Sequence, residues 1–400
     1  MDIRTYWVWL QNGMGIAART SEALAAFESP EAMAQAGPTA WRLSGAFTPK
    51  QIQRLEQSRP EDARATVEQC DKNGWRLITP ADADYPPLLR KLDNAPVVLY
   101  TWGDVSCLQY RLPVAMVGTR AASQYGTEVA GRLSASMAEA GAVIVSGGAL
   151  GVDSTAHAGA LYAKGKTIAV LGCGLAANYL MGNYPLRREI AQNGAVVSEY
   201  PPQTPALGKN FPVRNRLISG MSYGTVVIEA GERSGSLITA SYALEQGRDV
   251  FAVPGDIINS AFTGANKLIR DGAKPVFSAA DVLEDYAARF PHLLDLESLE
   301  RVLPNIRVAP GKTGKPKRAP AAKPAPPPPP PPPPPKKKSP GDNLSPDAGH
   351  VYGLFDAQPA HVDDLVRAAQ WPASRVITAL TELEIGGYIE LTSGKRYALI

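Results

Sequence analysis

The stretch Ala142-Val143-Ile144-Val145-Ser146-Gly147-Gly148-Ala149-Leu150-Gly151-Val152-Asp153 decides the fold of this chain. Its short apolar run is typical of a strand buried on both faces of a parallel sheet. The glycines let the backbone turn sharply and approach a ligand closely. A helical pattern follows, and the free N–H groups at its start point to the same edge of the sheet. The stretch therefore predicts a strand, a tight turn and a helix at an anion site, most commonly a phosphate site.

Three more glycine-rich turns follow apolar runs between residues 112 and 286. They are Val117-Gly118-Thr119-Arg120, Gly172-Cys173-Gly174 and Glu229-Ala230-Gly231-Glu232-Arg233-Ser234-Gly235-Ser236. Strands are expected near 114–118, 142–146, 167–172, 195–199, 225–230, 249–253 and 275–277. Helices are expected near 124–140, 153–163, 184–193, 213–221, 235–246, 263–271 and 280–286. This alternation predicts an α/β fold, a Rossmann-like doubly wound parallel sheet with right-handed crossovers.

Residues 1–70 are expected to form a small N-terminal helical domain. Helix caps are predicted at Ser29-Pro30-Glu31 and at Thr48-Pro49-Lys50-Gln51. The turn Asn12-Gly13-Met14-Gly15 is compatible with SAM-like or helix-hairpin-helix modules that touch DNA backbones. Few Lys or Arg residues flank it, which favours a packing or dimer module. Residues 71–290 then form the extended Rossmann-like domain, with additional strands at 75–78 and 97–100.

Residues 304–344 form a linker rich in Pro and Lys, with an uninterrupted proline run at Pro326–Pro335. This composition predicts a polyproline II spacer, at ~3.1 Å per residue and so roughly 30 Å for the run. A ligand of SH3-like domains is the functional alternative. The segment from Arg307 to Lys338 holds nine basic and no acidic residues, so the net charge of +3 leaves about −6 elsewhere. A polyanion site on the folded parts must therefore be a local patch.

Residues 345–400 are expected to form three helices followed by a hairpin around Ser393-Gly394-Lys395. This order predicts a winged helix-turn-helix domain, a fold that often binds DNA. Seven acidic residues outnumber four basic ones there. A protein-docking or accessory role is therefore as plausible as DNA binding.

Composition excludes several classes of protein. No run approaches the ~18 apolar residues of a membrane span, and the first residues lack a signal-peptide pattern. The three cysteines (Cys70, Cys107 and Cys173) are far apart, which fits a reducing cytoplasm without disulfides or a zinc site. With four histidines, a His-based metal site is not expected either. We expect a cytoplasmic protein without membrane association, metal or cofactor.

The turn at Gly118-Thr119-Arg120 lacks the Gly-x-Gly-x-x-Gly pattern of nicotinamide binding, and no Walker A loop occurs. A Thr hydroxyl and an Arg fork beside backbone N–H groups suit a phosphate clamp. A structural ion pair of Arg120 is the alternative.

The segment Lys209-Asn210-Phe211-Pro212-Val213-Arg214-Asn215-Arg216 holds three cations, with no acidic residue between Glu199 and Glu229. Cations interleaved with an aromatic ring suit single-stranded nucleic acid, on which a ring such as Phe211 can stack. The alternative is a loop that caps the sheet through Arg–carboxylate pairs. Nearby, Ser234 or Ser236 is expected to cap a helix, and Lys267 adds a cation at the same edge.

Catalytic groups are scarce, and no catalytic residue is predicted. Asp153 and His157 are expected in core or cap roles, and nothing marks Cys173 as an activated nucleophile.

In these stretches the chain closely resembles the DNA-processing protein A family (DprA, also called Smf). The matching segments are Val117–Arg120, Ser146–Asp153, Phe211–Gly220, Glu229–Ala240 and Val253-Pro254-Gly255. The resemblance implies a single-stranded DNA-binding protein without catalytic activity. It also implies that the protein protects incoming DNA in natural transformation, loads a RecA-type recombinase on it, and dimerises through the Rossmann-like domain.

The resemblance also implies a set of DNA- and phosphate-binding residues. They are Gly118, Thr119, Arg120, Gly147, Gly148, Lys209, Arg214, Asn215 and Arg216, with Arg187 as the basic residue after the third strand. Arg120 and Arg214 are expected to be solvated phosphate contacts rather than supports of the fold, because this rim faces a crevice.

An enzyme is the competing interpretation, a nucleotide-base hydrolase of the lysine-decarboxylase-like Rossmann group. Those proteins pair a Pro-Gly-Gly-x-Gly-Thr turn with a nearby Glu. This chain has Ala230-Gly231-Glu232-Arg233-Ser234-Gly235-Ser236 instead, which weakens that interpretation.

Overall fold

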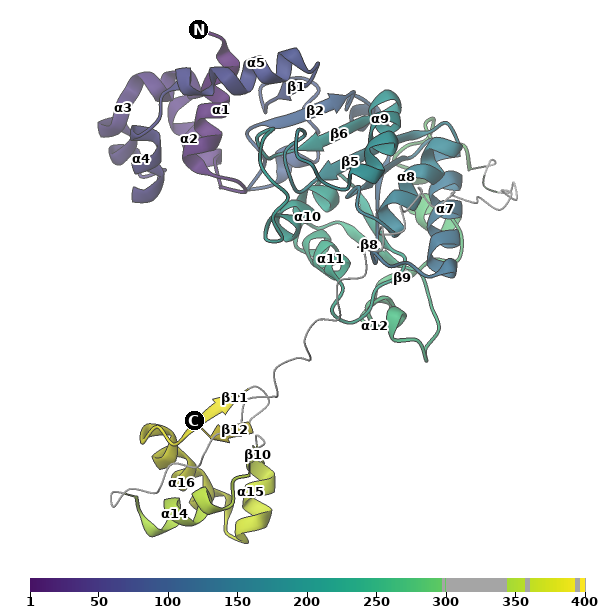
Figure 1. Cartoon of the computed structure of the whole chain (residues 1–400). Coiled ribbons are helices and arrows are strands. Elements are labelled where there is room, and N and C mark those ends of the chain that lie inside the picture. Colours follow the sequence, from purple (N-terminus) through teal and green to yellow (C-terminus); the bar gives the residue numbers. More distant parts are fainter. Residues whose placement is uncertain (297–298, 300–343, 357–359, 393–395, 400) are drawn as a thin grey trace, which may run out of the picture. The chain divides into compact units, whose positions relative to one another are not determined.

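The computed structural model describes residues 1–296, 299, 344–356, 360–392 and 396–399. These residues belong to two compact units, one within Met1–Pro316 and one within Lys317–Ile400 (Figure 1). The predicted linker at 304–344 lies outside the described residues except for Leu344.

The first unit is built on a large sheet with the strand order β1-β2-β6-β5-β4-β3-β7-β8-β9. β3 to β9 pair in parallel, whereas β1 and β2 join one edge in antiparallel fashion. The strands are β1 Arg76–Ile78, β2 Leu99–Gly103, β3 Pro113–Val117, β4 Val143–Ser146, β5 Lys166–Leu171, β6 Ala195–Ser198, β7 Gly224–Val227, β8 Asp249–Ala252 and β9 Lys274–Pro275. The predicted Rossmann-like parallel sheet is confirmed.

Helices cover both faces of this sheet (Figure 1). Along β3, Ala115 and Val117 point to one face and pack in a core with α10–α12, and Val114 and Met116 pack on the other with α7, α8 and α13. The helices are α6 Cys107–Tyr110, α7 Gln124–Glu139, α8 Val152–Tyr162, α9 Tyr184–Asn193, α10 Asn210–Gly220, α11 Gly235–Glu245, α12 Thr263–Arg270 and α13 Ala280–Ala287, with short 3-10 turns η2 Leu89–Lys91, η3 Met181–Asn183 and η4 Ser260–Phe262. Burial on both faces explains the continuous apolar runs of the strands.

β3 has β4 on one side and β7 on the other, so the direction of strand order reverses there. In open α/β sheets the crevice at such a reversal, outside the carboxyl ends of the strands, is the usual ligand site. The turns after β3 and β7 meet at this crevice: the Thr119 N–H donates to the Glu229 carbonyl at 2.8 Å.

The N-terminal helices form a third core, which includes Tyr100 of β2. They are α1 Ile3–Met14, α2 Ser21–Phe27, α3 Pro30–Ser44, α4 Pro49–Glu56, η1 Pro60–Ala63 and α5 Arg64–Lys72. Both predicted caps are present, at Ser29 and Thr48. Gly13 lies inside α1, and a Cβ there would stand 2.1 Å from a methyl carbon of Leu55. This glycine therefore serves close helix packing, in line with the packing interpretation of residues 12–15.

The second unit has the winged-helix order and its own apolar core. Its elements are α14 Pro346–Gly353, β10 Ala360–His361, α15 Val362–Ala369, α16 Ala373–Ile385, β11 Ile389–Thr392 and β12 Arg396–Leu399. The three strands pair in the order β10-β12-β11. The sequence did not indicate β10, which is only two residues long. The predicted turn at 393–395 lies outside the described residues.

Candidate nucleic-acid interface

A cavity of about 500 Å³ lies at the carboxyl ends of β3 and β7. It brings together Gly118, Thr119, Arg120, Phe211, Arg214, Asn215, Ser234 and Ser236 of the predicted set. Residues that sequence reasoning did not assign to the site complete its wall, namely Val117, Ala149, Asp153, Gly208, Pro212, Ile218, Gly235, Ile238 and Thr239. The missed apolar members gave no signal, because their periodicity is that of ordinary helix and strand residues.

Three helices begin at this cavity. α8 starts at Val152, α10 at Asn210 and α11 at Gly235. Ser234 caps α11, as predicted, and its hydroxyl lies 2.8 Å from that of Ser236. Asn215 links α10 to α11 by donating to the Gly235 carbonyl at 3.2 Å. The positive dipole ends of three helices therefore converge on one crevice and favour an anion there.

α10 begins three residues earlier than the sequence predicted, which changes the setting of the central segment. Pro212 is tolerated in the first helical turn because the N–H groups of that turn have no helical partner. Phe211 thus stands on the helix, half-buried, with its ring toward the cavity.

Arg120 is exposed and its guanidinium lies 5.1 Å from the centre of the Phe211 ring. Among the described residues, this guanidinium forms no hydrogen bond or ion pair. Arg120 therefore has the position and the freedom expected of a phosphate contact. The alternative, a structural ion pair of Arg120, is not found among the described residues.

Arg214 differs from the prediction. Its side chain is buried, and its Nη1 donates to the carbonyl of Gly147 at 2.7 Å and to that of Val170. The Gly147 carbonyl follows β4 directly, and the Val170 carbonyl lies near the end of β5. The guanidinium therefore connects the ends of two neighbouring strands. The expectation that Arg214 is a solvated side chain without a role in the fold is wrong, because two strand-end carbonyls depend on it. It still lines the cavity.

Asp153 lies on the first turn of α8, and its carboxylate is next to the guanidinium of Arg214 on α10. A Cβ built on Gly147 would lie 2.5 Å from the Asp153 Oδ2 and 2.8 Å from the Arg214 Nη2, so this glycine makes room for both. Burial raises the pKa of the Asp153 carboxyl, and the charge of Arg214 opposes that rise. The carboxylate also accepts from the Ala149 N–H at 3.3 Å, which fixes the turn after β4.

Arg216 requires a correction as well. It is fully buried, and its Nη2 donates to both carboxylate oxygens of Glu199 at 2.7 Å. Glu199 also accepts from the Ala17 N–H at 3.1 Å, which connects the N-terminal helices to the sheet. The predicted phosphate contact is therefore replaced by a buried Arg–carboxylate pair, the alternative that the sequence left open for this segment.

Arg187 is likewise buried, and its Nη2 donates to the carbonyls of Tyr179 and Leu180. Its side chain holds the segment after β5 in place instead of facing the cavity, so its assignment as a phosphate contact is corrected.

The remaining predicted residues do not line the cavity. Lys209 is exposed at the start of α10, and Lys267 is exposed on α12. Gly147 and Gly148 lie behind the wall, with Gly148 in the left-handed region at φ 64°.

Carboxylates are sparse in this cavity: Asp153 is the one acidic residue among its lining residues. The Glu229 carboxylate is occupied elsewhere, because it accepts from the hydroxyl of Ser123 at 2.6 Å and from its N–H at 3.1 Å. In the described part of the chain, no cluster of three or more His, Cys, Asp or Glu side chains could hold a metal. No helix among the described residues is long and apolar enough to cross a membrane.

Two arginines among the described residues of the winged-helix unit are held in ion pairs. Arg375 forms a bidentate pair with Asp347 at 2.7 Å, and Arg367 pairs with Asp364 at 2.9 Å. On α16, Ile377 and Ile385 are 50% and 83% exposed. A recognition helix of this kind offers little to a phosphate backbone.

Comparison with known proteins gives consistent matches. Residues 76–287 match the profile of the DNA recombination-mediator protein A family, and residues 322–395 that of the DprA winged helix domain. The chain is 34% identical to Protein Smf of Synechocystis over 83% of its own length and 82% of that protein. It is 41% identical to DNA processing protein DprA of Bacillus subtilis over 54% of its own length and 73% of that protein. Among solved structures, it resembles DNA processing protein A of Streptococcus pneumoniae, with 36% identity and a TM-score of 0.62. The match covers 71% of this chain and 99% of that one.

Proposed function

The chain belongs to the DNA recombination-mediator protein A family, and on that basis we propose that it is a single-stranded DNA-binding protein without catalytic activity. The observation that carries the proposal is the contact at the cavity between Phe211, which is half-buried, and Arg120, which forms no ion pair with the described residues. A cation and an aromatic ring on one rim suit the phosphate and the base of an unpaired nucleotide. In the cell, the protein protects incoming DNA in natural transformation and passes it to a RecA-type recombinase.

The same features favour a single strand over a duplex. In a duplex, the faces of the bases are covered by their neighbours, and Phe211 could reach only phosphates. Electrostatic attraction alone is a weak basis for duplex binding here, since the net charge outside 307–338 is about −6.

Binding of matched oligonucleotides over a salt series tests the proposal. We expect the full chain to bind a single strand well above a blunt duplex of equal length at moderate salt. Equal affinity for both would refute it.

A nucleotide-base hydrolase remains the alternative function. It would need a carboxylate at the cavity to activate water or the sugar, whereas Glu229 is committed to Ser123 and Asp153 lies beside Arg214. Incubation with nucleoside monophosphates separates the two proposals. Release of free base would establish the enzyme, and intact nucleotides together with oligonucleotide binding support the DNA-binding protein.

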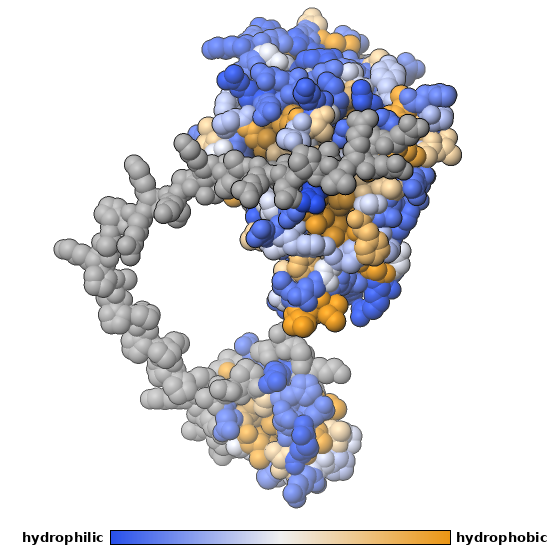
Figure 2. Space-filling model, turned by 90° about the vertical axis from the view of Figure 1, so that its right-hand side faces the viewer, coloured by the Kyte–Doolittle hydropathy of each residue, from blue (hydrophilic) through white to orange (hydrophobic). Residues whose placement is uncertain are grey.

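We also propose that the protein is a cytoplasmic homodimer whose interface lies on the Rossmann-like domain. Ile257, Ile258 and Phe277 are 88%, 90% and 78% exposed and follow the adjacent parallel strands β8 and β9. Hydrophobic side chains are also visible on one face of this unit (Figure 2). Light scattering should give a dimer for the parent chain and a monomer for Ile258→Asp, and a monomeric parent would contradict the proposal.

The recombinase proposal has its own test. Purified chain added to a single strand covered by a single-strand-binding protein should shorten the lag before RecA-type filaments assemble. An unchanged lag, with single-strand binding intact, would restrict the function to binding and protection.

A further inference from the structure

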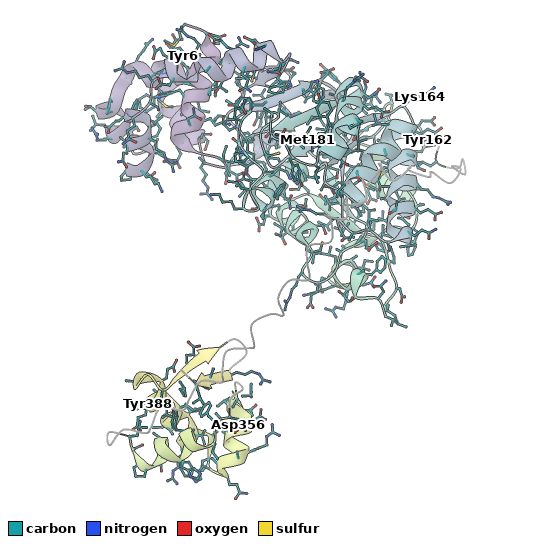
Figure 3. The ribbon with its side chains drawn as sticks, in the orientation of Figure 1. Tyr6, Tyr162, Lys164, Met181, Asp356 and Tyr388 are labelled. Atoms are coloured by element: carbon teal, nitrogen blue, oxygen red, sulfur yellow. The ribbon has the colours of Figure 1, made fainter. Side chains whose placement is uncertain are left out.

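Tyr179 lies next to the cavity but was not part of the predicted site. It belongs to the segment between β5 and α9, which also contains η3 and the exposed Met181 (Figure 3). Its ring centre is 5.2 Å from that of Phe211, with the two planes tilted by 42°. Both rings are half-buried, so the pair presents a partly open aromatic surface at the rim.

The surrounding structure holds Tyr179 in place. The buried Arg187 donates to its carbonyl and places its guanidinium 5.6 Å from the centre of the Tyr179 ring. The next residue, Leu180, has a left-handed backbone with φ 45° and ψ 58°. Leucine rarely adopts this conformation, and residues held in such regions cluster at ligand sites. A buried arginine and a strained residue thus fix one aromatic ring beside another.

Arg120 covers Phe211 with a planar cation, at a distance that a stacked base could also adopt. Since no hydrogen bond or ion pair within the described residues retains its guanidinium, Arg120 is free to leave the ring for a phosphate. Its departure would expose more of the Phe211 ring, which packs against Tyr179. The cation and the aromatic pair can therefore engage the phosphate and the base of one strand together.

We propose that Tyr179 is a nucleobase-stacking residue and that Tyr179 and Phe211 form a two-ring platform for an unpaired base. The proposal rests on the single-stranded DNA binding proposed above and deepens it. Bases inside a duplex have no free face for this platform, so it selects unpaired strands. Arg187 acts as a positioning residue, because it holds Tyr179 without facing the cavity.

The test compares Tyr179→Ala, Tyr179→Leu and Tyr179→Phe in the full chain, with Tyr162→Ala as the control. Tyr162 is 56% exposed at the end of α8 and is absent from the cavity lining. Loss of one stacked base weakens binding about 5- to 150-fold. We expect this loss for the Ala and Leu variants on oligo(dT), and values within about twofold of the parent for Tyr179→Phe and Tyr162→Ala.

Two readouts separate stacking from a structural role. The salt slope of Tyr179→Leu should equal that of the parent, because stacking releases no counterions. On a fully abasic strand of the same length, parent and Tyr179→Leu should bind equally, since no base is present to stack. The inference would be overturned if Tyr179→Leu also bound the abasic strand more weakly than the parent. It would equally be overturned if Tyr179→Leu bound oligo(dT) within twofold of the parent.

The outcome for the parent chain distinguishes the two levels of the proposal. If the parent fails to bind any single strand, the proposed function and this inference both fail. If the parent binds and the Ala and Leu variants bind equally well, the DNA-binding function stands and the stacking role of Tyr179 is refuted.

Discussion

Arg120→Ala and Arg214→Ala should both weaken DNA binding but should differ widely in their effects on stability. Arg120 is exposed, and its one recorded side-chain partner among the described residues is the Phe211 ring, at 5.1 Å. Arg214 is buried and donates to the Gly147 and Val170 carbonyls. Both side chains line the same cavity. The pair therefore separates phosphate contact from support of the fold within one site.

The expected magnitudes follow from these contacts. Arg120→Ala loses an exposed cation–π contact, which is about 0.5–1 kcal/mol. Arg214→Ala leaves two buried carbonyls without a donor, at about 1–3 kcal/mol for each unsatisfied group and so roughly 2–6 kcal/mol in total. For a unit of this size, 1 kcal/mol lowers the Tm by about 2–4 °C. Arg214→Ala should therefore melt roughly 4–24 °C below the parent, and Arg120→Ala within about 4 °C of it.

Thermal melts and oligonucleotide binding over a salt series measure both effects. Both variants should weaken single-strand binding, and Arg120→Ala should also reduce the slope of log affinity against log salt by ~0.7, the value for one phosphate contact. Arg214→Ala should leave that slope nearly unchanged, because its buried guanidinium acts on the site through geometry. Arg214→Lys keeps the charge without the planar fork and should melt between the parent and Arg214→Ala. The reasoning is refuted if Arg214→Ala melts with the parent, or if Arg120→Ala binds with unchanged affinity and slope.

Three further predictions concern other parts of the chain. Burial lowers the pKa of His157 to about 3 in the folded state. Below pH 6.5, the approximate pKa of an unfolded histidine, the unfolded chain therefore binds a proton that the folded chain does not bind. The free energy of unfolding falls as the pH is lowered through this range. From pH 7 to pH 5.5 this decline is about 1.3 kcal/mol, and denaturant unfolding of His157→Gln should lack it; an equal decline in the variant would contradict the assignment. Glu199→Gln leaves Arg216 buried without its carboxylate and should cost about 3–5 kcal/mol, whereas Glu128→Gln, in an exposed pair, should cost under about 0.5 kcal/mol in the same urea titrations. A chain of residues 1–310 should keep its single-strand affinity within about threefold at moderate salt, because the cavity lies within the first unit; a loss above tenfold would assign DNA contacts to the removed part.

The sequence predicted the fold well because strand periodicity and glycine turns are local signals. The expected strands and helices of the sheet agree with the structure to within a few residues, and the caps at Ser29 and Thr48 are present. The helix expected near 213–221 begins three residues earlier in the structure. Pro212 is typical of a residue just before a helix. Proline in a first helical turn gives the same local pattern, and only the packing of the helix distinguishes the two.

The roles of the arginines could not be predicted in this way, because they depend on burial. The resemblance to one family's site covers three arginines that differ in burial. Arg120 is exposed, whereas Arg214 and Arg216 are buried. Position on α10 explains part of this difference. Arg214 is three residues beyond Phe211 and shares its face toward the cavity, whereas Arg216 is two residues further and points toward Glu199 and the N-terminal helices.

This arrangement has a consequence for how the site is built. Arg216 anchors α10 to the sheet through Glu199, Arg214 ties the same helix to the ends of β4 and β5, and Arg187 secures the neighbouring Tyr179 segment. Three buried cations thus fix the aromatic pair and the helix N-termini before any DNA arrives. A preformed site loses little entropy when it binds, so the flexible part of the interaction is left to the strand and to exposed cations such as Arg120. Affinity for a single strand should therefore depend on the buried arginines through geometry and on the exposed ones through charge, and only loss of the exposed ones should act without lowering stability.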